Sequence, residues 1–434
     1  MGYNAWELKG GKEVPVIYDT LRLINGHVFI VGKSGTGKTH LLREMIRQLS
    51  AQTQGRLRVH VFDVHGDIEI EGASVVRFSE ATPYGFNPLV VNPDPDFGGV
   101  RKRVQSFVAA LKRTGYGPGA KQEAALRNIL LDLYAANGFY EDKPESWRLD
   151  DGVSRARPKR FPTMDDAVRF TNYKLREMYL GTSSKAVESL EKFYRKQGQF
   201  YTRIKRLGRE TGADLDDLKA DLKKRAEESV DLFKEHLDQV QTGHELDDLI
   251  KYDSKDVMKG LADRMENLRS IGIFRPERPP FDPRTPIWRY DIKALASKEK
   301  QLFVNFLLES IYLGAVQRGM KNDVVEIVVL DEAHLFFNDD PENPINTIAK
   351  EARKFGLGLF CASQSPTHFS DDFISNVGTK IILGIDQMYW EGTVRKMKIE
   401  LKDLEWIRPQ QQIVMQMNNK GDTRNRFTYV ALRK

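Results

Sequence analysis

The chain has a single cysteine, Cys361, among its 434 residues. One thiol excludes an internal disulfide framework, and no Cys or His residues have the spacing of a zinc site. The sequence also lacks any run of about 18 apolar residues, so we expect no integral membrane segment. The first residues lack the apolar stretch of a secretory signal, which favours a cytoplasmic location.

Neither sign of charge dominates. The chain has 67 Lys and Arg against 61 Asp and Glu, for a net charge of +6. Apolar residues make up 40% and charged residues 29%, which is the balance of a globular protein rather than a disordered one. The small positive excess permits nucleic acid as a partner without establishing it.

Short apolar runs alternate with amphipathic stretches at both ends of the chain. The runs predict strands at residues 27–31, 58–64, 75–78, 287–292, 326–330, 357–362, 380–385, 413–417 and 428–432. Helical spacing appears at residues 39–52, 298–318 and 346–355. Strands that alternate with helices favour a mostly parallel sheet covered on both faces.

The middle of the chain lacks convincing strands. Apolar residues recur every three or four positions over 190–207 and again over 215–240, which predicts two long helices joined by a turn at Thr211-Gly212. We therefore expect an α/β domain made of residues 1–99 and 275–434, interrupted by a helical insertion at 100–274. Long insertions add only slowly to the entropic cost of closing a loop.

A glycine-rich loop between the first strand and helix carries the most information about function. Its residues fit the pattern G-x-x-x-x-G-K-[ST], and they are Gly32, Lys33, Ser34, Gly35, Thr36, Gly37, Lys38 and Thr39. Glycines let successive N–H groups turn toward a phosphate, and the following helix adds the positive end of its dipole. Lys38 can reach the β- and γ-phosphates of ATP, and the Thr39 hydroxyl can ligate Mg²⁺. A chance glycine turn is the alternative, and the flanking strand and helix disfavour it.

Two acids follow the strand at 326–330. Asp331 at its end can hold a carboxylate beside a Mg²⁺ ion, and Glu332 can polarise the attacking water. Acids also occur at strand ends with no role other than contact with solvent. Their pairing with the phosphate loop favours the catalytic interpretation.

Five further residues are weaker candidates. Gln364 follows the strand at 357–362 and could sense the γ-phosphate or orient water. Arg353 could stabilise transition-state charge at a neighbouring subunit's nucleotide, although spacing alone favours a solvated cation. Asp63, His65 and Asp67 follow the second strand and could touch the site or cap the next element.

Together these segments resemble the HerA/FtsK superfamily of ring-forming, DNA-pumping ATPases, and the HerA branch most closely. The resemblance covers about half of the chain and rests, in order, on GKSGTGKT at 32–39, VFDVHGD at 61–67, YGFNPL at 84–89, LRSIGIF at 268–274, IVVLDEAH at 327–334, KEARKFGLGL at 350–359 and ASQSP at 362–366. The helical insertion is similar to those in the ATPases of conjugation and type IV secretion.

The resemblance implies a RecA-like P-loop domain that hydrolyses ATP with Mg²⁺. Lys38 and Thr39 would bind phosphate and the metal ion, Asp331 would support the ion, and Glu332 would be the catalytic base. Gln364 would be the sensor, and Arg353 a finger that acts across a subunit boundary. The implied partners are double-stranded DNA and other copies of the chain in a ring, a hexamer by resemblance.

The quartet Asp331-Glu332-Ala333-His334 also suggests a helicase of the DEAH type. Such helicases need a second nucleotide-binding lobe after the sensor strand. Residues 365–434 are too few for one, so we disfavour this alternative.

A basic stretch with aromatic residues lies in the middle of the chain. Residues 193–209 contain no acid and include Arg195, Lys196, Arg203, Lys205, Arg206 and Arg209. Such a segment can track a nucleic-acid backbone. The acidic stretch at 210–239 favours the other interpretation, in which two antiparallel helices neutralise each other. DNA would then meet loops of the α/β domain.

Three functions compete at this point. The first is a ring-forming ATPase that moves double-stranded DNA. The second is a traffic ATPase of a conjugation or type IV secretion apparatus. The third is a HerA-like ATPase scaffold that activates a nuclease or other effector protein in antiviral defence.

Overall fold

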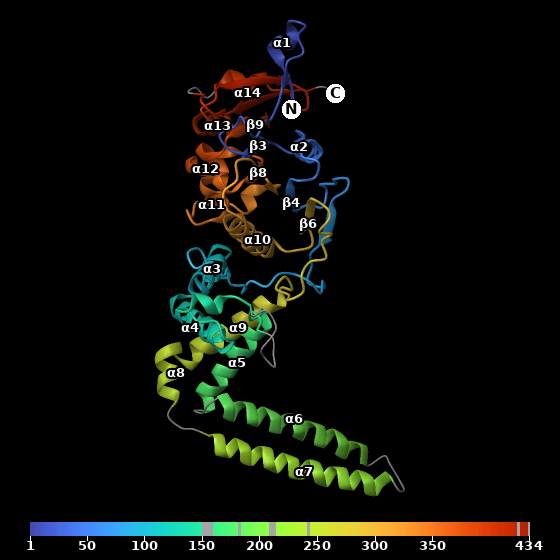
Figure 1. Cartoon of the computed structure of the whole chain (residues 1–434), viewed down its shortest axis with the longest axis vertical. Coiled ribbons are helices and arrows are strands. Elements are labelled where there is room, and N and C mark those ends of the chain that lie inside the picture. Colours follow the sequence, from blue (N-terminus) through green and yellow to red (C-terminus); the bar gives the residue numbers. More distant parts are fainter. Residues whose placement is uncertain (150–158, 181–183, 208–213, 241–243, 423–425, 433–434) are drawn as a thin grey trace. The chain divides into compact units, whose positions relative to one another are not determined.

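The computed structural model describes residues 1–149, 159–180, 184–207, 214–240, 244–422 and 426–432. The chain forms two compact units, one of residues 1–86 and 271–434 and one of residues 87–270. The first unit is α/β, and the described residues of the second are helical (Figure 1). The sequence placed the corresponding divisions at 99/100 and 274/275.

An 11-stranded sheet forms the centre of the first unit, in the order β2-β1-β11-β10-β9-β3-β8-β7-β4-β6-β5. The strands are β1 (Gly2–Asn4), β2 (Pro15–Val16), β3 (Val28–Gly32), β4 (Arg58–Asp63), β5 (Ser74–Arg77), β6 (Ile287–Asp291), β7 (Glu326–Leu330), β8 (Leu357–Ser363), β9 (Thr379–Gly384), β10 (Gln412–Met417) and β11 (Phe427–Ala431). From β5 to β9 every pairing is parallel, and from β9 to β2 every pairing is antiparallel. The mostly parallel α/β sheet is confirmed, whereas β1 and β2 were not predicted.

The central strands are apolar because helices cover both of their faces. Every residue of β3, β7 and β8 is buried. The helices of this unit are α1 (Ala5–Lys9), α2 (Lys38–Gln52), α10 (Ser297–Arg318), α11 (Pro344–Glu351), α12 (Asp371–Asn376), α13 (Trp390–Met397) and α14 (Leu401–Trp406). The predicted helix at 346–355 is α11 followed by a 3₁₀ turn, Ala352–Phe355, which ends at Gly356 with φ 66°.

The order of the parallel strands determines where functional residues meet. β8 lies between β3 and β7, and all three run in the same direction. Their carboxyl ends therefore share one edge of the sheet. The phosphate loop after β3, the acids after β7 and Gln364 after β8 all lie at that edge.

The two segments that flank the inserted unit lie side by side in the first unit. Phe86 N–H donates to the Ile273 carbonyl at 3.1 Å, and Gly85 N–H donates to the Glu277 carbonyl at 3.0 Å. A Cβ on Gly85 would lie 2.2 Å from the Ile273 oxygen, so only glycine fits there. The chain thus leaves and returns at neighbouring positions, which disturbs little of the core.

The second unit contains α3 (Val100–Arg113), α4 (Ala120–Ala136), α5 (Met164–Leu180), α6 (Ser184–Leu207), α7 (Asp214–Gln239), α8 (His244–Tyr252) and α9 (Lys255–Ser270). The long helices α6 and α7 pack along each other (Figure 1). Lys196 Nζ on α6 lies 2.9 Å from Glu228 Oε2 on α7, an ion pair of the kind expected between these helices. The predicted turn at Thr211-Gly212 and the side chains of Arg203, Lys205, Arg206 and Arg209 lie outside the described residues.

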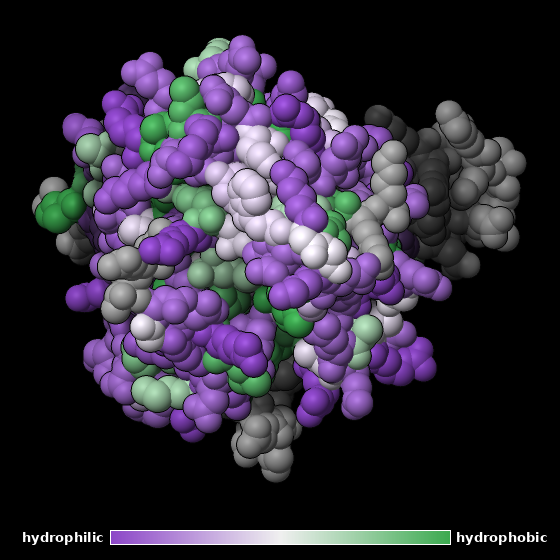
Figure 2. All heavy atoms as spheres, turned by 90° about the horizontal axis from the view of Figure 1, so that it is seen from above, coloured by the Kyte–Doolittle hydropathy of each residue, from purple (hydrophilic) through white to green (hydrophobic). Residues whose placement is uncertain are grey.

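One face of the molecule is mainly polar (Figure 2). Figure 2 shows one face on which hydrophobic side chains are interspersed among hydrophilic ones. Among the residues that the structure describes, no helix combines the length and the apolar character needed to cross a bilayer.

Candidate functional site

The phosphate loop joins β3 to α2 through two glycines with left-handed backbone. Gly35 has φ 79° and Gly37 has φ 95°, values that side chains disfavour. Lys33 N–H donates to the Gly384 carbonyl of β9 at 2.8 Å, and Thr36 Oγ1 donates to the Lys33 carbonyl at 2.7 Å. These bonds hold the loop in a curved conformation of the kind that directs N–H groups at an anion.

Lys38 lies at the centre of the site, although it begins a helix. Its side chain is 7% exposed. The ammonium donates to the Gly32 carbonyl at 2.8 Å, and its Nζ lies 3.9 Å from Glu332 Oε1. The structure therefore brings the predicted phosphate-binding lysine and the predicted base together, although 293 residues separate them in the chain.

The two acids after β7 have different environments. Asp331 is buried, and burial together with the neighbouring Glu332 raises the pKa of its carboxyl. Its Oδ1 accepts the Glu332 N–H at 3.0 Å. Glu332 has left-handed backbone, with φ 50° and ψ 45°, which is uncommon for a residue with a side chain and is found often at functional sites.

The second carboxylate oxygen of Glu332 has two nitrogen neighbours. Gln364 Nε2 donates to Oε2 at 3.4 Å, and His334 Nδ1 lies 3.3 Å from the same oxygen. Sequence reasoning named Gln364 but gave His334 no role. The quartet that contains His334 was interpreted through its two acids and as part of the family resemblance, and no spacing rule indicates which way the His334 ring turns.

Arg353 lies at the opposite edge of the sheet from the phosphate loop. It is exposed in the 3₁₀ turn that precedes β8. Burial and, to a smaller extent, the charge of Arg353 lower the pKa of His27 to about 4, and His27 immediately precedes β3. Arg353 is thus placed at the amino ends of these strands and away from the loop of its own chain. Its action on a neighbouring subunit stays a prediction.

The segment after β4 combines a structural acid with one that affects the site. Asp63 is fully buried, pairs with Arg289 Nε at 2.8 Å, and accepts backbone N–H bonds from His65, Gly66 and Ile68. Asp63 therefore shapes this turn. The negative charge of Asp67 contributes to raising the pKa of Asp331, so Asp67 lies on the side of the site.

A residue from the antiparallel part of the sheet also touches the phosphate loop. Gln410, just before β10, donates from Nε2 to the Gly35 carbonyl at 3.0 Å and has left-handed backbone with φ 64°. The sequence gave no signal for this contact, because Gln410 lies 375 positions away from Gly35.

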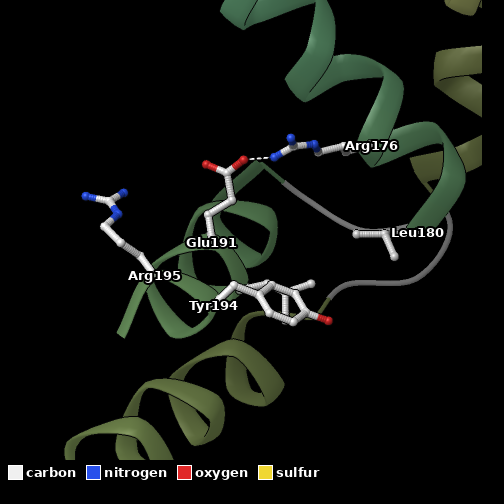
Figure 3. A pocket seen from close by; sticks show the side chains of 6 residues that line it. Arg176, Leu180, Glu191, Tyr194 and Arg195 are labelled. Atoms are coloured by element: carbon white, nitrogen blue, oxygen red, sulfur yellow. Dashed lines mark ion pairs between the residues drawn. The ribbon is translucent and has the colours of Figure 1, made fainter. Parts of the chain in front are cut away.

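The helical unit has a separate pocket of about 450 Å³ between α5 and α6. Arg176 and Glu191 form an ion pair at this pocket, beside Tyr194 and Arg195 (Figure 3). The ion pair offsets part of the positive charge, and the pocket lies in a different unit from the phosphate loop. We assign it no part in the site.

A glycine-rich loop after one parallel strand, with paired acids after a strand two positions away, defines a P-loop ATPase of the RecA-like class. The family described as "Helicase HerA, central domain" matches residues 7–311, about 70% of the chain. The chain belongs to this family. The match includes the phosphate loop and ends before β7, so the assignments of Asp331, Glu332 and Gln364 rest on geometry.

Curated relatives match over short stretches. The chain is 43% identical over 63 residues to the DNA double-strand break repair helicase HerA of Pyrococcus furiosus, which is 14% of this chain and 11% of that protein. Identity to the protein of the same name from Saccharolobus solfataricus is 41% over 64 residues, covering 14% and 13%. These matches thus span a small fraction of the relatives' length.

Solved structures share the fold over nearly the whole chain. VirB4 of Thermoanaerobacter pseudethanolicus has a TM-score of 0.61 at 14% identity, with 100% of this chain and 96% of that chain covered. The conjugative coupling protein TrwB bound to the ATP analogue ADPNP has a TM-score of 0.52 at 11% identity, covering 99% and 92%. At such identities the likeness concerns the fold alone.

The packing around Gly32 generates a stability prediction. A Cβ at this position would lie 2.4 Å from Thr36 Oγ1 and 3.1 Å from Leu383 Cβ. We expect Gly32→Ala to destabilise the first unit by about 1–3 kcal/mol, because overpacking forces neighbours apart. Thermal unfolding followed by circular dichroism measures the effect.

The matched control is Gly314→Ala in α10, where a Cβ meets nothing within 4 Å and removal of a helical glycine should not destabilise the protein. Equal melting temperatures for Gly32→Ala and wild type would contradict the close approach.

Proposed function

We propose that this protein is an ATP-hydrolysing motor that assembles as a ring, a hexamer, and moves double-stranded DNA. The observation that carries the proposal is the 3.9 Å separation of Lys38 Nζ from Glu332 Oε1. It supports the proposed pairing of Lys38 as the phosphate-binding residue with Glu332 as the residue that activates water. Membership of the HerA central-domain family and the named repair helicases among its relatives support DNA as the substrate.

Each site residue has a proposed part in hydrolysis. The N–H groups of residues 32–39 and the Lys38 ammonium bind the β- and γ-phosphates. Glu332 accepts a hydrogen bond from the attacking water and orients it, while Gln364 senses the γ-phosphate. Arg353, exposed on the opposite edge, would meet the nucleotide of a neighbouring subunit.

The residues also fit a magnesium ion. Among the described residues no cluster of three or more His, Cys, Asp or Glu could hold a metal by itself. Mg²⁺ commonly uses one or two protein oxygens and completes its shell with phosphate oxygens and water. The Asp331 carboxylate and the Thr39 hydroxyl supply such oxygens, and a cation would favour the charged form of Asp331. When bound, the ion would neutralise developing phosphate charge.

A second function has its own support. The fold likeness to VirB4 extends over all of this chain, including the helical unit. A traffic ATPase of a conjugation or secretion apparatus, which acts on protein or nucleoprotein, is therefore the second candidate. The Lys38 and Glu332 chemistry would be the same, and the substrate would differ.

Particle mass and DNA response together test the proposed motor. We expect sedimentation to give a hexameric mass with ATP and Mg²⁺, and double-stranded DNA to stimulate ATP hydrolysis. Displacement of a protein roadblock from DNA would support movement. Assembly with no DNA response would instead favour a scaffold for an effector protein, and stimulation by a protein substrate would favour the traffic ATPase.

Two substitutions separate nucleotide binding from turnover. Lys38→Ala should abolish ATP binding, because the loop loses the cation that meets the phosphates. Glu332→Gln should bind ATP normally and lose at least 100-fold in hydrolysis, on the order of a general base's contribution. Calorimetry and phosphate release measure the two steps. Normal hydrolysis by Glu332→Gln would remove the assignment of the base.

Mixing subunits tests Arg353. If its guanidinium completes a neighbour's site, Arg353→Ala subunits added to wild type should lower activity more than in proportion to their share. ATP hydrolysis across a series of mixing ratios measures this, with the adjacent exposed Lys354→Ala as matched control. A linear decline with Arg353→Ala would mean that the residue does not act across an interface.

A further inference from the structure

The carboxylate of Glu332 is held at one oxygen and open at the other. Oε2 lies 3.3 Å from His334 Nδ1 and 3.4 Å from Gln364 Nε2. Oε1 lies 3.9 Å from Lys38 Nζ, beyond ordinary hydrogen-bond distance. The oxygen that faces the phosphate loop is thus the one available to a water molecule.

Two oxygen atoms lie close to Nδ1 of His334. Nδ1 lies within ion-pair distance of the Glu332 carboxylate, and a carboxylate can only accept, so a hydrogen bond formed between them is one that Nδ1 donates. Ser363 Oγ also lies 3.5 Å from Nδ1, and it directs its own proton toward the Ser365 carbonyl at 3.5 Å. Both oxygens around Nδ1 can therefore accept from one N–H group. The contacts are compatible with the Nδ1–H form of the ring.

The surroundings of His334 restrain the ring. Its side chain is 24% exposed, and it lies in the 3₁₀ turn that follows β7. The ring of His368 lies 5.1 Å away, centroid to centroid, and packs against it. Ser363, on the other side, is fully buried at the end of β8. The imidazole is therefore in contact with the neighbouring strand through Ser363 and with the ring of His368.

We propose that His334 is a positioning residue, which donates from Nδ1 to Oε2 of Glu332 and so aims Oε1 at the attacking water. The proposal rests on the proposed ATP hydrolysis and assigns it a residue beyond those expected from the sequence. Glu332 needs such support because its left-handed backbone alone does not determine the direction of its side chain. Gln364 also donates to Oε2, but its longer and exposed side chain is free to turn toward the γ-phosphate.

The expected effect falls on the chemical step. A misplacement of about 1 Å can cost on the order of 100-fold in rate. We therefore expect His334→Ala to lower kcat by about 10- to 100-fold, with the Kd for ATP within about twofold of wild type. Lys38 and the loop glycines remain in place, so phosphate binding has no reason to change.

Two conservative variants make the test specific for the Nδ1 position. The amide nitrogen of asparagine is as far from Cβ as Nδ1, whereas that of glutamine corresponds to Nε2. We expect His334→Asn to recover most of the kcat lost in His334→Ala, and His334→Gln to recover little. His368→Ala is the control for packing, because it removes the ring beside His334 and keeps Nδ1. It should lower kcat less than His334→Ala does, because the Nδ1 group is still present.

The measurements are single-turnover ATP hydrolysis, ATP binding by calorimetry and thermal unfolding for each variant. Recovery by asparagine alone, with Kd constant, supports the proposal. It is overturned if asparagine and glutamine behave alike, if kcat of His334→Ala equals that of wild type, or if His368→Ala reproduces the loss. Wild-type protein that binds but never hydrolyses ATP would instead refute the proposed function, so the two failures are distinguishable.

Discussion

The ammonium of Lys38 lies between the Gly32 carbonyl and the Glu332 carboxylate, and the rest of the site is arranged around it. A buried cation is costly unless partners surround it, and these partners come from the ends of two different strands. The contact therefore requires β3 and β7 to run in parallel with their carboxyl ends at one edge. This arrangement is maintained by the buried strands, by the helices on both faces and by the loop conformation.

The strand order explains how one chain combines distant segments in a single site. β8 separates β3 from β7, so Gln364 at its end lies between the phosphate loop and the two acids. The helical unit enters the chain between residues 86 and 271 without breaking this arrangement. Its flanking segments hydrogen-bond to each other through Phe86 and Ile273.

Much of the fold was predictable from the chain. Every parallel strand agrees with its predicted range to within about one residue at its start, because buried parallel strands are continuous apolar runs. The strands β1 and β2 escaped prediction since they are two or three residues long, too short for a periodic pattern. The 3₁₀ turn at 352–355 escaped prediction for a related reason, because its apolar spacing continues that of α11.

The order of residues alone predicted the phosphate loop, the acids after β7 and the family. A P-loop is built from neighbouring residues, so their types and spacing indicate its chemistry. Only the tertiary structure decided which side chains contact Glu332 and the phosphate loop. His334 contacts Glu332 and Gln410 contacts Gly35, and these contacts depend on ring orientation and on strands far away in the chain. Arg353 was separated from its own phosphate loop by the direction of β8. Local spacing specifies a loop, but the direction of a side chain depends on what packs against it.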